Sequence, residues 1–142
     1  MSNMQGYYEI LEETNRIALA TSVDNIPNVR NVNFAYDTNR PGIIYFTSDR
    51  RNQKVVEFGK NNKVAFTTIP TEGIPHVRSH HAMVEKSKYS IDEVKELFLA
   101  KVPGYDEILS GLRETLEVFE IQIKEATIIL GYDQQPSQIR FE

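Results

Sequence analysis

A cluster of hydroxyl, amide and basic side chains occupies residues 46–54, which read Phe-Thr-Ser-Asp-Arg-Arg-Asn-Gln-Lys. Two hydroxyls end a run of strand-forming residues, and a lysine follows in the first turn of an expected helix. Cationic side chains and the unpaired N–H groups of a helix N-terminus both favour anions. Thr47, Ser48 and Lys54 can therefore reach one phosphate. The alternative interpretation is an ordinary helix cap with a solvated basic face.

A second polar feature lies on the expected strand 29–36. Because side chains alternate along a strand, Arg30 shares one face with Val32, Phe34 and Tyr36. Asn31 and Asn33 share the other face with Val29 and Ala35. Two asparagines beside apolar residues need hydrogen-bond partners if they are buried. They indicate either a polar strip that faces a heteroaromatic ligand or a face exposed to solvent.

Other catalytic chemistries find little support in the sequence. It contains no cysteine, no Gly-x-Ser-x-Gly elbow and no glycine-rich phosphate loop. The three histidines, His76, His80 and His81, lie in a strand-like segment. There His76 and His80 are about 13 Å apart, and His80 and His81 point to opposite faces. We expect polar strand residues and no metal site, with a metal ligand or a cofactor contact as alternatives.

The composition favours one globular domain that spans residues 1–142. The chain is 40% hydrophobic and 25% charged, with 16 basic and 20 acidic residues and a formal net charge of −4. A mildly acidic chain has no general attraction to nucleic acid. No apolar run approaches the roughly 18 residues that cross a bilayer, and the N-terminus lacks the pattern of a signal peptide. We therefore expect a cytoplasmic protein that binds neither nucleic acid nor membrane.

Hydrophobic periodicity predicts a mainly β, α+β domain. The expected helices cover residues 4–14, 51–61, a segment that begins after Ser90 and ends before Pro103, and 106–114. Ser90 and Glu93 form a capping box for the third helix. The expected strands cover 17–23, 29–36, 43–47, 63–69, 76–86, 116–124 and 127–130. The first three form a meander, and the set suggests a closed or nearly closed antiparallel barrel with peripheral helices.

Three segments between residues 16 and 69 carry a resemblance to a known family. They read Ile-Ala-Leu-Ala-Thr-Ser at 17–22 with Asn25 and Pro27, Pro-Asn-Val-Arg-Asn-Val at 27–32, and Tyr-Phe-Thr-Ser at 45–48 with Gln-Lys at 53–54 and Asn-Asn-Lys-Val-Ala at 61–65. In order and spacing the chain resembles the FMN-binding split-barrel proteins related to pyridoxamine 5′-phosphate oxidase. Leu-Glu-Val-Phe at 116–119, after a helical insertion, is similar to the short members described as general flavin reductases or nitroimidazole-resistance proteins.

The resemblance implies an antiparallel split β-barrel and a set of FMN contacts. Arg30 takes the place of an arginine that reaches the phosphate, and Asn31, Val32 and Asn33 lie along the flavin. Thr47 and Ser48 contact the ribityl chain and phosphate, and Lys54 pairs with the phosphate. Gln53 stands where the oxidases have a further arginine, which Arg50 or Arg51 replaces. The expected cofactor-binding set is Arg30, Asn31, Val32, Asn33, Thr47, Ser48, Arg51, Gln53 and Lys54.

The resemblance further implies an FMN-dependent oxidoreductase that passes hydride or electrons to a small molecule. Family members are homodimers with the flavin at the subunit interface. Ala35 replaces a lysine of the oxidases, and their C-terminal arginine pattern is not clearly present, which argues against oxidation of pyridoxamine phosphate itself. Three alternatives stay open: a non-catalytic flavin-binding or sensor protein, a barrel that binds haem or a deazaflavin, and a cofactor-free structural domain.

Overall fold

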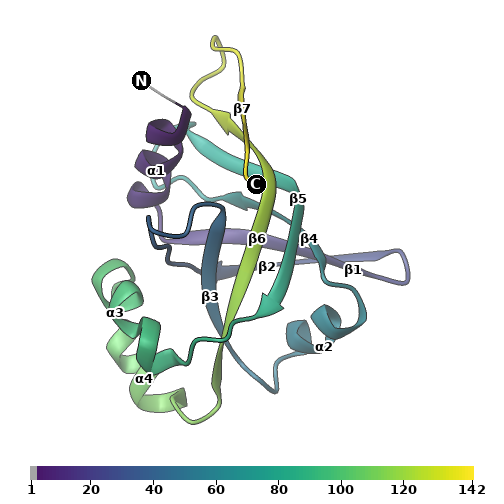
Figure 1. The fold of residues 1–142 in the computed structure, drawn as a ribbon, viewed down its shortest axis with the longest axis vertical. Coiled ribbons are helices and arrows are strands. Elements are labelled where there is room, and N and C mark those ends of the chain that lie inside the picture. The colour runs from purple at the N-terminus through teal and green to yellow at the C-terminus, as the bar shows by residue number, and fades with distance from the viewer. Residues whose placement is uncertain (1–2) are drawn as a thin grey trace.

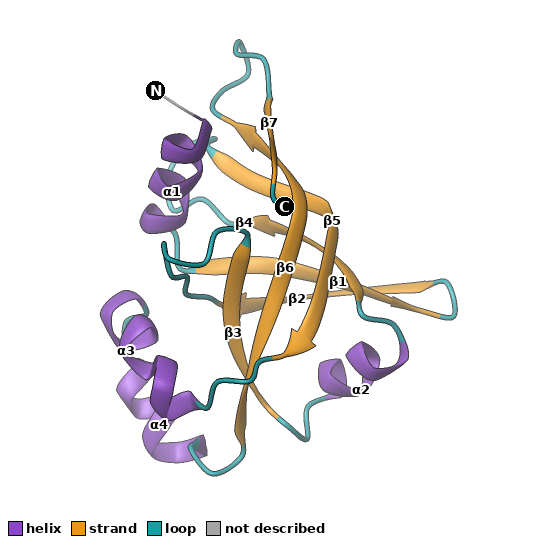
Figure 2. Cartoon of the chain, viewed as in Figure 1, coloured by secondary structure: helices purple, strands orange, loops and turns teal. Residues whose placement is uncertain are grey.

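The computed structural model describes residues 3–142, which form four helices and seven strands (Figures 1 and 2). In chain order these are α1 (Asn3–Glu13), β1 (Arg16–Val23), β2 (Ile26–Asn33), β3 (Ile43–Asp49), α2 (Gln53–Lys60), β4 (Lys63–Thr68), β5 (His76–Lys86), α3 (Ile91–Lys101), α4 (Tyr105–Leu112), β6 (Leu116–Ile129) and β7 (Ser137–Arg140). None of the helices in this range combines the length and apolar composition that crossing a bilayer requires.

The strands form one antiparallel sheet whose two ends almost meet. Its order is β2-β1-β4-β5-β6-β3, and β7 pairs with β6 outside this path. Within residues 3–142, the two end strands β2 and β3 are linked only through the bridge between Ala35 and Tyr45. The barrel is therefore split along this line. This confirms the expected mainly β, antiparallel split-barrel fold.

Two aromatic side chains of the sheet hold α2 in place. Phe58 is the buried side chain of this short helix, and its ring lies 5.7 Å from Phe46 and 5.6 Å from Phe119, centroid to centroid. Phe46 and Phe119 stack on each other at 5.4 Å. All three belong to the interior of the barrel, so their burial fixes α2 beside the ends of β1 and β3.

A second core lies on the outer face of β3 and β6. There α3 and α4 pack Phe98 and Tyr105, which stack at 5.0 Å, over Tyr45 and Val118. Figure 1 shows the two helices on the opposite side of β3 from α2. Glu120 lies on this outer face and is only 3% exposed. Arg40 and Ser87 supply hydrogen bonds to the buried carboxylate.

Most expected helices and strands end within two residues of the observed ones, and three differences are informative. The segments 116–124 and 127–130 form one strand, β6, because Glu125 keeps the pairing with β7 through Arg140. The first three strands are not a meander, since β3 pairs with β6 rather than with β2. The second strand begins at Ile26, directly after a tight turn in which Asp24 and Asn25 both adopt positive φ.

Lys101 at the end of α3 ties this helix to α1. Its ammonium donates to the carbonyl oxygens of Leu11 and Thr14, each at 2.5 Å, and lies 4.8 Å from the centre of the Phe34 ring. Burial lowers the pKa of Lys101, and the charge of Glu12 opposes this. The lysine thus satisfies carbonyl groups that the end of α1 leaves without a helical partner.

Replacing Lys101 by methionine should lower the free energy of unfolding by about 1–3 kcal/mol, because the stem is kept while two carbonyl groups lose their donor. Urea unfolding followed by circular dichroism measures this change. Lys95→Met is the matched control, since Lys95 forms a long ion pair, 3.8 Å, with the exposed Asp92. Equal losses in the two variants would show that the carbonyl contacts add nothing to stability.

Candidate functional site

A pocket of about 260 Å³ opens where the edges of β2 and β3 separate. Its walls come from β2, the end of β3, the start of α2, one face of α4 and the start of β6. Six of the nine predicted cofactor residues line it: Asn31, Val32, Asn33, Thr47, Ser48 and Lys54. The split of the barrel thus brings the two polar segments of the sequence together in one pocket.

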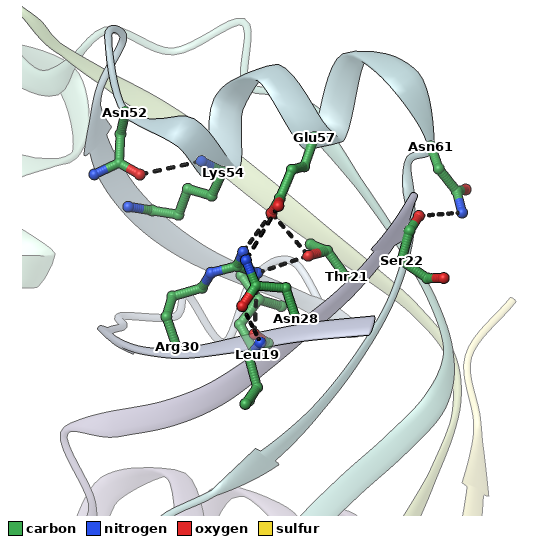
Figure 3. Close-up of polar contacts among 10 residues, drawn as sticks. Leu19, Thr21, Ser22, Asn28, Arg30, Asn52, Lys54, Glu57 and Asn61 are labelled. Carbon is green, nitrogen blue, oxygen red and sulfur yellow. Dashed lines mark hydrogen bonds and ion pairs between the residues drawn. The ribbon is translucent and has the colours of Figure 1, made fainter. Parts of the chain in front are cut away.

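The start of α2 positions Lys54 in this pocket. The side chain of Asn52 caps the helix and accepts the backbone N–H of Lys54 at 3.1 Å. Burial lowers the pKa of Lys54, the neighbouring positive charge of Arg30 lowers it further, and Asp49 opposes both effects. Within residues 3–142 no side chain pairs with its ammonium, which extends away from Glu57 toward the Asn52 end of the helix (Figure 3). Lys54 is therefore a half-buried cation that is available to a ligand.

Arg30 lies close to Lys54 but is already engaged with protein groups. Its guanidinium donates to the hydroxyl of Thr21 at 2.9 Å and to the carbonyl oxygen of Leu19 at 3.3 Å, and it forms an ion pair with Glu57 (Figure 3). Its side chain does not line the pocket. The structure thus places the predicted phosphate arginine beside the pocket with its charge compensated.

The two predicted hydroxyls also have partners. Thr47 shares a hydrogen bond of 2.6 Å with the hydroxyl of Tyr105, and Ser48 donates to the carbonyl oxygen of Asp49 at 3.0 Å. Burial raises the pKa of Tyr105, and the bond to Thr47 opposes this. The Thr47–Tyr105 contact joins the end of β3 to α4, so the same hydroxyl that faces the pocket also fixes its helical wall.

Arg51 and Gln53 lie outside the pocket. Arg51 is exposed and pairs with Asp49, at 2.9 Å from Nε to Oδ1 and 2.5 Å from Nη2 to Oδ2. It lines a neighbouring hollow beside residues 109–115. The hydrogen bonds from Arg51 hold the pKa of Asp49 well below its usual range. Gln53 is the exposed first residue of α2.

Six further residues line the pocket without having been predicted: Asp49, Asn52, Tyr105, Ile108, Leu112 and Leu116. Tyr105, Ile108 and Leu112 follow the spacing of three and four residues that marks one face of a helix. That spacing could have identified the face of the helix. No local signal, however, indicates that this face packs over pocket residues that lie more than fifty positions earlier in the chain.

All three histidines lie on β5, and none lines this pocket. His76 is half-buried, and its Nδ1 lies 2.7 Å from the carbonyl oxygen of Ile74. His80 and His81 are both exposed. The expected simple alternation fails here because the pairing with β6 shifts on each side of His81. Within the range that the structure describes, no three His, Cys, Asp or Glu side chains are placed to hold a metal.

Solved structures share this fold at low sequence identity. A heme binding protein from Mycobacterium smegmatis superposes with a TM-score of 0.76 at 12% identity, over 99% of this chain. The chain spans only 58% of that protein's length. A NimC/NimA family protein from Clostridium acetobutylicum gives a TM-score of 0.71 at 23% identity, covering 97% of this chain and 92% of its own. A FAD-binding protein from Mesorhizobium loti gives a TM-score of 0.66 at 16% identity, and the match covers 89% of this chain and 90% of that protein.

The match to a family model is more direct. No curated protein matches the chain. The model described as pyridoxamine 5′-phosphate oxidase-like, however, matches residues 10–135, which include every strand except β7 and every residue that lines the pocket. The chain therefore belongs to the pyridoxamine 5′-phosphate oxidase-like family.

Proposed function

We propose that this chain binds FMN at the split between β2 and β3 and acts as an FMN-dependent oxidoreductase on a small molecule. The observation that carries the proposal is the unpaired, half-buried ammonium of Lys54 in that pocket. A cation without an internal partner favours an anionic ligand, and the phosphate of a flavin mononucleotide is such an anion.

The donor set of the pocket fits the three parts of FMN. Lys54 suits the phosphate, and the hydroxyl of Thr47 suits the ribityl chain. Asn31 and Asn33 offer amide groups to the edge of a heteroaromatic ring, and α4 supplies apolar side chains on the opposite wall. Pockets that hold drug-sized ligands measure about 300–1,000 Å³, so this smaller one leaves part of the ring uncovered by a single chain.

We propose a second copy of the chain as that cover. Val29, on the face of β2 that also carries Asn31, is 63% exposed although it is apolar, and Ile26 at the start of the strand is 70% exposed. Val29 pairs with Ala20 and Asn31 pairs with Ala18, so this apolar surface is continuous with the pocket. A homodimer formed on this face would bury Val29 and cover the flavin at the same time.

In this proposal the protein binds and orients while the flavin supplies the hydride or electron transfer. Asp49, the one carboxylate in the lining, is held by Arg51 and by the hydroxyl of Thr115 at 3.0 Å. Its task is therefore to fix the turn before α2. Lys54 holds the anionic end, and the apolar side chains of α4 exclude water from the ring.

The visible spectrum of the purified protein tests this function. We expect a yellow protein that releases FMN on denaturation and whose apo form quenches the fluorescence of added FMN. It should also reduce bound flavin when a nicotinamide donor is supplied, which separates an oxidoreductase from a passive flavin carrier. A colourless preparation that leaves FMN fluorescence unchanged would contradict the proposal.

Haem is a second candidate because His80 lies beside a different hollow. This hollow, of about 420 Å³, is on the outer face of the sheet, and Ala18, Ala20 and Ala65 give it an apolar floor. A histidine imidazole is a common axial ligand of haem iron. The same spectrum decides between the two, since a haem complex shows an intense Soret band, and His80→Ala should shift that band if His80 is the axial ligand.

A further inference from the structure

We infer that Glu57 limits the affinity of the site for a phosphate, because it keeps Arg30 paired within the protein; this rests on the proposed flavin site. Glu57 would thus set how strongly the pocket distinguishes FMN from riboflavin, which has no phosphate. The residue belongs to neither the predicted cofactor set nor the pocket lining.

The position of Glu57 follows from the geometry of α2. Lys54 and Glu57 are three residues apart, so both lie on the face of the helix that looks toward β1 and β2. Lys54 is directed to the pocket, and Glu57 is directed to Arg30 (Figure 3). One short helix therefore presents a cation and an anion to the same strand.

Three donors from the sheet hold the Glu57 carboxylate. Its Oε1 accepts the hydroxyl of Thr21 at 2.9 Å and the guanidinium of Arg30, and its Oε2 accepts the amide of Asn28 at 3.1 Å. The side chain is 12% exposed. A carboxylate with this many partners in a largely enclosed place does not leave Arg30 easily.

The Arg30–Glu57 pair lowers the positive charge that the pocket offers to a phosphate. Arg30 cancels Glu57, and Arg51 cancels Asp49, so Lys54 supplies the one uncompensated positive charge of this group. A phosphomonoester carries close to two negative charges at neutral pH. Its second charge gains no partner at the site, because Glu57 compensates the charge of Arg30. Removing that carboxylate should free Arg30 for the phosphate.

Fluorescence titration of the apo protein with FMN and with riboflavin tests this inference. In Glu57→Gln we expect FMN to bind about tenfold more tightly, because a charge-assisted contact becomes available, while riboflavin changes less than about twofold. Glu96→Gln is the matched control, since it removes the same charge from an exposed position on α3. It should leave both affinities at their wild-type values.

The outcomes separate the inference from the function beneath it. Riboflavin binding that persists in Glu57→Gln with FMN affinity unchanged or weaker would overturn the role of Glu57 and leave the flavin site in place. Absence of flavin binding in wild type and in both variants would overturn the proposed function, and this inference with it.

A double variant covers the case in which Glu57→Gln does not fold. Arg30→Gln with Glu57→Gln removes the whole ion pair, so no buried charge is left alone. We expect the ratio of FMN to riboflavin affinity to stay within about threefold of wild type, because the pair has no net charge. A loss of about tenfold or more in this ratio would show that Arg30 contacts the phosphate in the wild-type protein, which contradicts the inference.

Discussion

Replacing Arg40 by alanine should lower the free energy of unfolding by about 3 kcal/mol. Its guanidinium donates to both carboxylate oxygens of Glu120, at 2.7 and 3.2 Å, and to the hydroxyl of Tyr45 at 2.6 Å. Glu120 is 3% exposed, and among residues 3–142 its carboxylate would keep a single hydrogen-bond donor, Ser87, without Arg40. Breaking a buried pair from one side costs about 3–5 kcal/mol, and the 30% exposure of Arg40 favours the lower end.

Urea unfolding of Arg40→Ala beside Arg113→Ala measures this effect. Arg113 also forms an ion pair, with Asp92, but these two side chains are 54% and 56% exposed, so we expect a loss below about 1 kcal/mol. Arg40→Met combined with Glu120→Leu should recover much of the stability, because no charge stays buried. Similar losses in Arg40→Ala and Arg113→Ala would contradict the importance of the buried network.

The pH dependence of stability offers a second signature of this network. Burial alone raises the pKa of Glu120, but the hydrogen bonds from Arg40 and Ser87 outweigh it, so the pKa lies below its ordinary value. A carboxyl with a lowered folded-state pKa stabilises above its unfolded pKa, and this contribution is lost as the pH falls. In Arg40→Ala the stability deficit should therefore be largest at neutral pH and shrink in acid.

Replacing Lys54 by alanine should weaken FMN binding by about 1–3 kcal/mol, which corresponds to roughly a 5- to 150-fold higher Kd. The reason is that Lys54 is the one uncompensated cation of the pocket group. Riboflavin affinity should change much less, since it lacks the phosphate. Fluorescence titration with the two ligands separates the effects.

Lys60→Ala is the control for this variant, because Lys60 is an exposed residue in the last turn of the same helix. It should leave both ligands unaffected. Equal weakening of FMN and riboflavin by Lys54→Ala would indicate a change in the shape of the pocket rather than the loss of a phosphate contact. Unchanged FMN affinity would remove Lys54 from the site.

The strands and helices were predictable because their residues carry local signals. The strand-forming residues at 17–23 and 76–86 and the capping box at Ser90 are properties of short segments, and the structure confirms these elements. The pairing of β3 with β6 was not predictable in this way. A short turn favours pairing with the preceding strand, and only the tertiary structure carries β3 across to β6.

In the candidate site, too, some residues were predictable from local sequence and others depend on the tertiary structure. Thr47, Ser48 and Lys54 lie within eight positions, so a strand followed by a helix suffices to bring them together. Tyr105 reaches the pocket because α3 and α4 dock on the outer face of β3. The sequence of a single segment does not predict this docking. The pairing of Arg30 with Glu57 was hidden for a similar reason, since it depends on how α2 docks against the sheet.

The central claim is that Lys54 holds the phosphate of FMN. A crystal structure of the protein in complex with FMN tests it most directly. The phosphate should lie within hydrogen-bond distance, about 3 Å, of the Lys54 ammonium, with the ring along Asn31 and Asn33 at the split between β2 and β3. A flavin bound at another surface, while the Lys54 side chain extends into solvent, would contradict the account.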